Sequence, residues 1–446
     1  MDNLPPGLTF NRVKIIFIII GAILAIILAI YFGLRMVQHA PAIQLTVWGV
    51  FDNKKAFDAL VKNYKKENSS VTITYVQKTY DLNETENYEK DLINALAEGK
   101  GPDIFMVQNN WLPKHQSKIK PLDPRLQTAI GFPYVNYLDK FPGVVVDDFT
   151  RDTTIYAAPL YLDSLAMFYN RDFFDRKGIA LVPSTWTEFE RTVPQLREID
   201  PSTNEIKRAA AAIGGSNASI NRSTDLLTAV MMQNGAEFTD KKVTHATFAQ
   251  GLGDGNPGIK GLKFYAQFAN SLSPFFTWSE RFPYSIDSFS SGDTAIMFNY
   301  AHVMPLVKSK NPFLDFRVAP LPQPAGITQP VNYANYWGFS VSKQSKNAQW
   351  AWDFIISITA NEASEGAYLE LTGKPPALRA LIDKKFNDPT LGVFARQALT
   401  AKSWRQKDDF EIERILSEMI SDVISGKLSA ESSILKAEDK VSLLMR

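Results

Sequence analysis

The sequence contains no cysteine among its 446 residues and only four histidines. The absence of cysteine excludes disulfides, thiolate metal sites, cysteine nucleophiles and lipid anchors attached through cysteine. The histidines lie far apart in the chain, and their spacing is not that of metal ligands (His39, His115, His245 and His302). We therefore expect neither a metal ion nor a cofactor.

The motifs of several large enzyme classes are also missing. The chain has no G-x-x-x-x-G-K-[ST] loop, no G-x-S-x-G turn and no H-E-x-x-H pair. An excess of charge of one sign is missing as well, because 48 Lys and Arg stand against 47 Asp and Glu. Nucleic-acid-binding domains usually carry a basic excess. We expect neither an enzyme nor a partner of nucleic acids.

One apolar segment near the N-terminus stands out from this balanced composition. Residues 15–34 are twenty in a row without a charge, and as a helix they would span about 30 Å, the thickness of a bilayer core. A cleaved signal peptide is the alternative. The apolar region of a signal peptide is shorter than this segment, however, and the small-x-small cleavage pattern at 40–42 has Pro at its middle position. We favour an uncleaved transmembrane anchor.

Basic residues on either side of this segment suggest its orientation. Arg12 and Lys14 precede it and Arg35 follows it, so the positive-inside bias is slight and favours a cytoplasmic N-terminus. The prediction is a single-pass protein of the cell membrane, with 1–14 in the cytoplasm, 15–34 as the anchor and 35–42 as a linker. Everything that follows would lie outside the cytoplasm.

The remaining chain is too long for one hydrophobic core, so we expect two domains. Alternating or continuous apolar runs predict strands at 43–49, 71–76 and 104–107, with a helix over 88–98 between the last two. This order is typical of an α/β fold with mainly parallel sheets. Farther along, 209–245 is predicted to be helical.

Ligands of such sheets bind at loops beyond the carboxyl ends of the strands. These loops and the later strand ends combine aromatic rings with amide, carboxylate and imidazole groups, which suits the flat faces and hydroxyl rims of sugars. The candidate ligand-binding residues are Asp52, Asn109, Asn110, Trp111, Tyr161, Asp163, Asn299, Tyr300, His302, Tyr336, Trp337 and Trp404. Two alternatives stay open: core packing for Trp111 and Trp337, and an internal salt bridge for Asp163.

Five segments carry a family resemblance. They are the opening strand at 43–49, Gly101-Pro102-Asp103-Ile104, the run from Ala158-Pro159 to Asn170-Arg171-Asp172, the run 289–299 (FSSGDTAIMFN), and 338–354. In their order and spacing they resemble the family 1 extracellular solute-binding proteins of ATP-binding-cassette (ABC) importers, the group that contains the maltose-binding proteins. The resemblance implies a two-lobed, periplasmic-binding-protein-like α/β fold that closes on its ligand.

The resemblance also implies roles for particular residues. Asp163 takes the place of a ligand-binding acid, Asn110 stands where some members carry Asp, and Tyr300 or His302 stands near a sugar-stacking Trp. The chain departs from the family in two ways. It lacks the Cys of lipid-anchored members, and Glu413 stands where maltose binders place a Trp, which argues against long maltodextrins.

These observations predict a first lobe formed by 43–160 and 325–375 and a second formed by 161–324 and 376–446. They predict a receptor that captures a small solute, with carbohydrate as the expected class, and delivers it to the permease subunits of an ABC importer. A membrane-tethered sensory or interaction module with the same fold is one alternative. An exported glycan hydrolase is the other, although nothing in the sequence marks a nucleophile.

Overall fold

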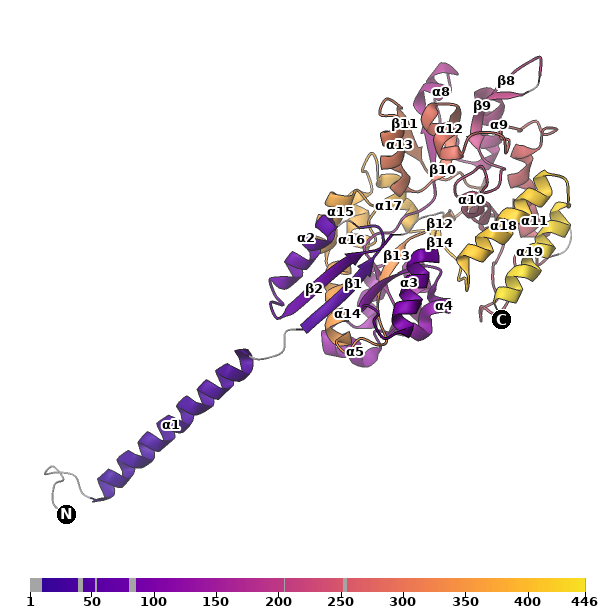
Figure 1. Cartoon of the computed structure of the whole chain (residues 1–446). Coiled ribbons are helices and arrows are strands. Elements are labelled where there is room, and N and C mark those ends of the chain that lie inside the picture. The colour runs from indigo at the N-terminus through magenta and orange to yellow at the C-terminus, as the bar shows by residue number, and fades with distance from the viewer. Residues whose placement is uncertain are drawn as a thin grey trace.

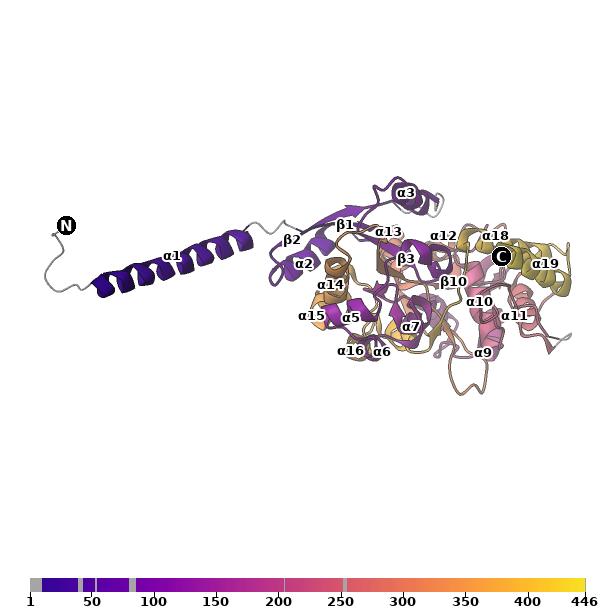
Figure 2. The ribbon, with the colours of Figure 1, turned by 90° about the horizontal axis from the view of Figure 1, so that it is seen from below.

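The computed structural model describes residues 10–38, 43–52, 54–79, 86–203, 205–251 and 255–445. They form two lobes and one separate helix, α1 (Phe10–Gln38), which extends away from the lobes (Figures 1 and 2). The side chains described in α1, those of 14–30, are exposed. Within the described part of the chain, no helix has both the length and the apolar character needed to cross a membrane.

The first lobe is built on a five-stranded sheet in the order β2-β1-β3-β13-β6. Its strands are β1 (Ile43–Gly49), β2 (Val71–Gln77), β3 (Ile104–Gln108), β6 (Ala158–Pro159) and β13 (Trp337–Val341). β1 is parallel to β2 and β3, whereas β13 is antiparallel to β3 and β6. The predicted strands at 43–49, 71–76 and 104–107 are confirmed.

The second lobe has its own five-stranded sheet, in the order β11-β7-β10-β9-β8. Its strands are β7 (Ala166–Asn170), β8 (Glu198–Ile199), β9 (Ile206–Ala212), β10 (Thr294–Asn299) and β11 (Phe316–Ala319). Only β9 and β10 pair in parallel, and the other neighbours are antiparallel. The predicted helix over 209–245 is confirmed only at 223–233, since 206–212 is a strand and 234–245 is not helical.

The prediction of mainly parallel sheets is therefore wrong for both lobes, which have mixed sheets. In the first lobe the reason lies in β13, which enters the sheet only after the chain has passed through the second lobe. It then runs opposite to β3 and pairs with it from Trp337 opposite Gln108 to Val341 opposite Ile104. Such a returning strand is not connected through a local right-handed crossover, so the parallel rule does not apply to it.

Helices and short strands cover the two sheets. In the first lobe they are α2 (Lys54–Lys65), α3 (Glu86–Ala97), α4 (Leu112–His115), η1 (Gln116–Lys118), α5 (Pro124–Ile130), α6 (Tyr134–Lys140), α7 (Gly143–Phe149), β4 (Thr150–Arg151), β5 (Thr154–Ile155), α14 (Ala348–Thr359), α15 (Glu362–Thr372) and α16 (Arg379–Lys385).

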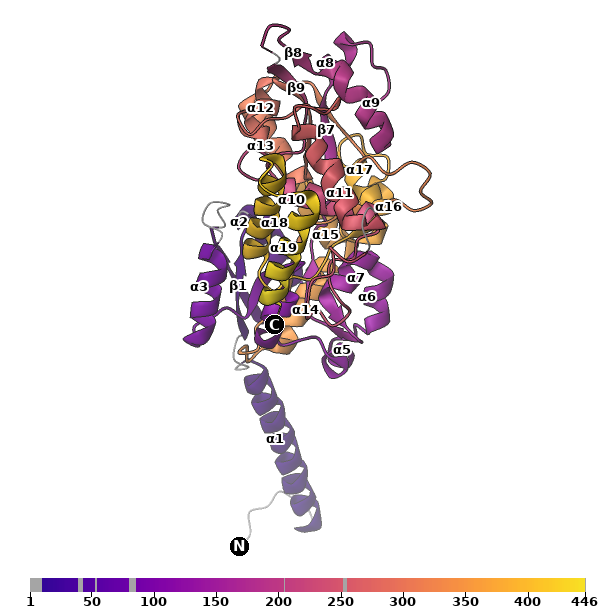
Figure 3. The same ribbon diagram turned by 90° about the vertical axis from the view of Figure 1, so that its right-hand side faces the viewer.

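In the second lobe and beside it lie α8 (Arg171–Arg176), α9 (Trp186–Leu196), α10 (Ser223–Gln233), α11 (Pro257–Ala266), η3 (Gln267–Ala269), α12 (Ser285–Ser291), η4 (Ala301–Val303), α13 (Met304–Lys310), β12 (Asn332–Tyr333), α17 (Gly392–Ala398), β14 (Ala401–Lys402), α18 (Asp409–Ile424) and α19 (Ala430–Leu444). Figure 3 shows α18 and α19 side by side across the front of that view.

Each lobe buries its own large hydrophobic core. The first core takes residues from 45–162, 334–382 and 395–401, and the second takes residues from 165–333 and 404–445. The chain therefore crosses between lobes near residues 163, 334 and the segment before 404. Leu378, Leu381 and Ile382 pack in the first core, although the predicted boundary assigned them to the second lobe.

Candidate functional site

A cavity of about 290 Å³ lies between residues of the two lobes. The first lobe contributes Glu89 and the end of β3 with the residues after it, Gln108, Asn109, Asn110 and Trp111. The second lobe contributes two helix beginnings with the loops before them: Asn217, Asn221, Arg222, Thr224, Asp225 and Thr228 around α10, and Asp409, Phe410, Ile412, Glu413, Arg414 and Leu416 of α18. Tyr284 and the interlobe segments with Tyr333, Ala334, Asn335 and Gln406 complete the lining.

The amide side chains after β3 are held by partners from distant parts of the chain. Gln108 donates through Nε2 to Asn335 Oδ1 at 3.1 Å, and Asn110 donates through Nδ2 to Gln406 Oε1 at 3.2 Å. The other amide oxygens, Gln108 Oε1 and Asn110 Oδ1, have no protein partner among the described residues. These buried acceptors line the cavity, and a bound solute with hydroxyl or amine donors would match them.

Trp111 lines the cavity and also packs in the core of the first lobe. Its ring lies 4.8 Å from that of Trp337 in a T-shaped contact and 6.4 Å from that of Tyr88, and the residue is only 3% exposed. Of the two readings left open, packing therefore describes Trp337, which lies behind Trp111 and outside the lining, whereas Trp111 also reaches the cavity.

The beginning of α10 supplies a charged part of the wall. Arg222 precedes the helix with φ of 62°, a left-handed conformation that is uncommon for a residue other than Gly. Its guanidinium lies 3.8 Å from Asp225 Oδ2, which also accepts a hydrogen bond from the Tyr300 hydroxyl at 2.7 Å. Asn299 donates to Asn221 Oδ1 at 3.0 Å. Asn299 and Tyr300 thus support lining residues from behind.

The first turns of α18 face the same space. Asp408 caps the helix by accepting from the backbone N–H of Glu411 at 3.1 Å. Asp409 and Glu413 are four residues apart, so they lie on one face of the helix, and both line the cavity. Burial raises the pKa of Asp409 to about 6. Burial also raises the pKa of Glu413.

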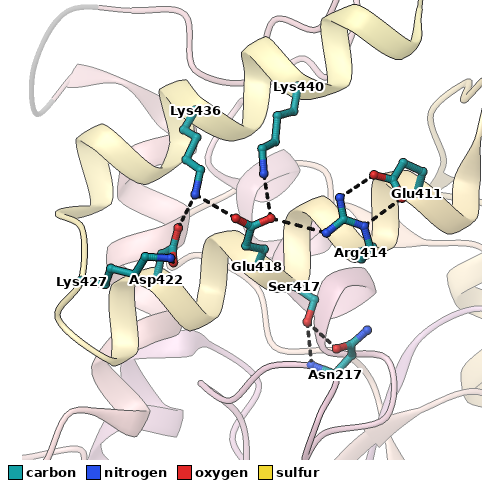
Figure 4. A network of polar contacts seen from close by, with 9 residues as sticks. All are labelled: Asn217, Glu411, Arg414, Ser417, Glu418, Asp422, Lys427, Lys436 and Lys440. Carbon is teal, nitrogen blue, oxygen red and sulfur yellow. Dashed lines mark hydrogen bonds and ion pairs between the residues drawn. The ribbon is translucent and has the colours of Figure 1, made fainter.

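A network of polar contacts holds α18 in position (Figure 4). Glu418 accepts from Lys436 at 2.8 Å and from Lys440 at 2.7 Å, which joins α18 to α19. At the other side of α18, Ser417 and Asn217 hydrogen-bond to each other. Because Asn217 lines the cavity, this contact ties the loop before α10 to α18.

The carboxylate that the first lobe contributes to the lining is ion-paired, unlike Asp409 and Glu413 of α18. Glu89 Oε1 lies 3.0 Å from Lys114 Nζ and 2.5 Å from His115 Nε2. Burial alone would raise the pKa of Glu89, but the hydrogen bonds from His115 and Lys114 outweigh it and lower the pKa. Burial lowers the pKa of His115 in turn. In the described part of the chain, no group of three or more acidic or His residues is arranged to hold a metal ion.

Of the predicted ligand-binding residues, Asn109, Asn110 and Trp111 line this cavity. Asp163 does not, because its carboxylate accepts from the backbone N–H groups of Ser164 and Ala301 at 2.9 Å and of His302 at 3.1 Å. It therefore holds the start of η4 and lies 3.4 Å from the His302 ring. Asp163 thus caps this backbone turn, and its contact with a ligand stays a prediction.

The other predicted residues also lie outside the lining. Asp52 pairs with Lys374 at 2.7 Å, and Lys374 lies 4.0 Å from the centre of the Tyr161 ring. Tyr336 donates to Asp148 Oδ2 at 2.6 Å, where burial raises the pKa of Asp148 to about 6. Trp404 packs 4.9 Å from Phe238 in the second core. Ligand contact for these residues stays a prediction.

Sequence reasoning missed the wall made by α10 and α18. Asn221, Arg222 and Asp225 lie more than 180 residues before Asp409 and Glu413 in the sequence, and no local pattern connects the two groups. One signal was available at Glu413, where the resemblance places a ligand-stacking Trp in maltose binders. That position does line the cavity.

Comparisons with known proteins identify the family. The sequence profile of the bacterial extracellular solute-binding proteins matches residues 49–365. The maltotriose-binding protein of Pyrococcus abyssi is 25% identical over 351 residues, which cover 77% of this chain and 68% of that protein.

Solved structures share the fold. The cyclic alpha-maltosyl-1,6-maltose binding protein of Arthrobacter globiformis superimposes with a TM-score of 0.73 at 18% identity, over 90% of this chain and 99% of that one. UgpB of Mycobacterium tuberculosis, in complex with glycerophosphocholine, gives 0.70 at 16% identity, over 90% and 98%.

These matches confirm both the two-lobed α/β fold and the prediction that the chain is not an enzyme, since the family and its neighbours are binding proteins. The family match spans well over half of the sequence, and the observed cavity between two lobes suits the capture of a solute. The chain belongs to the family of bacterial extracellular solute-binding proteins.

Proposed function

We propose that this protein is a carbohydrate receptor that delivers its ligand to an ABC importer. The observation that carries the proposal is the composition of the interlobe cavity, in which amide side chains from both lobes alternate with aromatic residues. Amides hydrogen-bond to hydroxyl groups in either direction, and aromatic rings give rigid contact area to the flat faces of sugar rings. The names of the maltotriose-binding relative and the maltosyl-maltose-binding neighbour support the same class of ligand.

Capture by closure of the lobes is part of the proposal. Contacts between the two sides already exist at one end of the cavity, where Gln406 N donates to Asn110 O at 3.1 Å and Lys114 lies 3.8 Å from Asp408. A ligand shifts such a hinge only if it binds the closed form more tightly than the open form. The amides of both lobes supply that difference, because they contact one solute together only when the lobes are close.

We further propose that residues 15–34 hold the protein in the cell membrane, with 35–42 as the tether and both lobes outside the cytoplasm. The support is the sequence itself, twenty residues without a charge and a chain without cysteine for a lipid anchor. A receptor kept beside the membrane stays near the permease subunits of its importer, where its effective concentration is high. Fractionation of cells that express the full chain, before and after deletion of 15–34, tests the anchor. Release of the intact chain by high salt would contradict it.

The sugar proposal is tested by thermal unfolding of the full-length protein with glucose and with malto- and cello-oligosaccharides of two to four units. A ligand at a hundred times its dissociation constant stabilises the folded state by about 2.7 kcal/mol. Isothermal titration then gives affinities for Asn110→Ala and for the control Gln195→Ala, which removes an amide side chain from α9. We expect the first change to weaken binding about tenfold, since a hydrogen bond to a buried polar partner is lost. The control changes an exposed residue outside the cavity and should leave affinity intact. Stabilisation by peptides and by no sugar would contradict the proposal.

A further inference from the structure

The charges around the cavity do not cancel. Four carboxylates line it, those of Glu89, Asp225, Asp409 and Glu413, together with two guanidinium groups. Two of the acids have cationic partners: Glu89 lies 3.0 Å from Lys114, and Asp225 lies 3.8 Å from Arg222. Asp409 and Glu413, by contrast, form no ion pair with a described residue.

The second guanidinium does not compensate for them. Arg414 is directed along α18 to Glu411, with hydrogen bonds of 2.8 and 2.5 Å, and to Glu418 at 3.6 Å (Figure 4). Its charge is therefore already matched by acids outside the cavity. Lys114 and Arg222 are near enough to lower the pKa of Asp409 and of Glu413, respectively, but neither cation forms an ion pair with these carboxylates among the described residues. The α18 wall is left with two carboxylates that no such ion pair neutralises.

A second and independent observation points to what would complete the site. Gln108 and Asn110 are 6% and 8% exposed, and their side-chain oxygens line the cavity without a protein partner among the described residues. Asn110 is linked through Gln406 to the start of α18, so these acceptors and the carboxylates border one space. Beside these acceptors, the indole N–H of Trp111 in the same lining is an unmatched donor among the described residues.

We propose that the ligand of this site carries a protonated amine beside its hydroxyl groups, as amino sugars do, and that Asp409 and Glu413 bind the ammonium. This inference rests on the proposed sugar-binding function and narrows the class of ligand. An ammonium supplies several N–H donors and one positive charge, which matches both the vacant acceptors and the charge excess. A quaternary ammonium brings charge but no donor, and a neutral sugar brings donors but no charge.

The experiment compares pairs of sugars that differ only at C2. Glucosamine and its β-1,4-linked dimer and trimer are titrated at pH 7 against glucose, cellobiose and cellotriose, which carry a hydroxyl in place of the amine. We expect the amino sugars to bind at least about tenfold more tightly, because hydrogen bonds to charged groups are stronger than neutral ones. Equal or tighter binding of the neutral sugars would overturn this inference while leaving the proposed function standing.

Variants test which residues cause the preference for amino sugars. Asp409→Asn and Glu413→Gln should lower the affinity for the amino sugars by a larger factor than the affinity for the neutral sugars, so that most of the preference for the amine is lost. Glu411→Gln is the matched control, since it removes the same charge from the same helix but from an acid that pairs with Arg414 outside the cavity. A preference that survives both cavity variants, or falls equally in the control, would contradict the assignment.

Further probes separate the remaining outcomes. Stabilisation by choline or by Ca²⁺ alone, with none by an amino sugar, would overturn the proposal that the ligand carries a protonated amine. Binding of no sugar from either series, nor from the oligosaccharides used above, would overturn the proposed function itself. The two failures are therefore distinguishable.

Discussion

The two walls of the interlobe cavity are built in different ways. The wall of the first lobe is the end of a buried strand, and its groups are neutral amides, a packed indole and one paired carboxylate. The wall of the second lobe consists of two helix beginnings, and it carries Arg222, Asp225, Asp409 and Glu413. The positive end of a helix dipole favours carboxylates in its first turns. The difference indicates that the first lobe sets the shape and hydrogen bonds of the site, whereas the second lobe sets its charge.

The largest difference in stability should separate the aromatic residues of the two walls, Trp111 and Phe410. Trp111→Ala should destabilise the protein by about 3–4 kcal/mol, because the side chain is part of the first core. Phe410→Ala, on the other wall, should change stability by less than about 1 kcal/mol, since Phe410 is 49% exposed. Urea unfolding of both variants measures the contrast. Equal losses would mean that the two walls are equally part of the folded core.

The next largest effect on stability should come from Glu365, a buried acid of α15 in the first lobe. Burial raises the pKa of Glu365 to about 8, against the hydrogen bonds from the N–H groups of Leu378 and Ala377. The folded state then keeps a proton that the unfolded state loses, so stability falls as the pH rises from about 4.5 to about 8.

Glu365→Gln removes this titration. The variant should be more stable than the natural chain by about 2–3 kcal/mol at pH 8 and should show no gain at pH 4. Thermal unfolding across this pH range measures the difference, and a gain that is independent of pH would rule out the raised pKa as its cause.

Asp409, an acid of the second wall, should make stability depend on pH in the same direction but by a smaller amount. Because the pKa of Asp409 is raised from 3.8 to about 6, folding loses stability as the pH rises through that interval. Asp409→Asn should therefore stabilise the ligand-free protein by about 1–2 kcal/mol at pH 7 and by little at pH 4. Glu411→Gln is again the control and should not stabilise. Stabilisation together with loss of amine binding would show an acid kept for function at the expense of stability.

The smallest expected effect concerns backbone strain, which the described lining residues show only at Arg222 of the second wall. Arg222→Gly and Arg222→Ala both remove the ion pair with Asp225, but Ala keeps the unfavourable φ of 62° and Gly does not. The Gly variant should therefore be more stable than the Ala variant by about 1 kcal/mol. If the order is reversed, the loop before α10 is not held in the observed conformation in solution.

The two walls also differ in how far the sequence predicts them. The strand at 104–107 is a continuous apolar run, and the polar residues after it stand where ligands bind in α/β sheets, so Asn109, Asn110 and Trp111 could be named in advance. The second wall has no such signal. Asn217 and Ser417 are 200 residues apart and meet only through the packing of α18 on the second lobe.

The secondary structure shows the same limit. The alanines at 209–212 have the highest helix propensity, yet they form β9, paired with β10 on one side and β8 on the other. The placement of a strand between two others overrides local preference, because small side chains fit a sheet that is buried on both faces. Likewise, nothing local to 337–341 tells β13 to enter its sheet antiparallel to β3.

By itself, the sequence determined the absence of cysteine chemistry, the long uncharged segment at 15–34, the first three strands and the family resemblance. Each of these depends on composition or on the periodicity of neighbouring residues. Only the tertiary structure decided which side chains border the cavity, why Asp163 caps a backbone turn, and that two acids of α18 form no ion pair with the described residues. These properties depend on contacts between residues far apart in the chain, and such contacts leave no local pattern in the sequence.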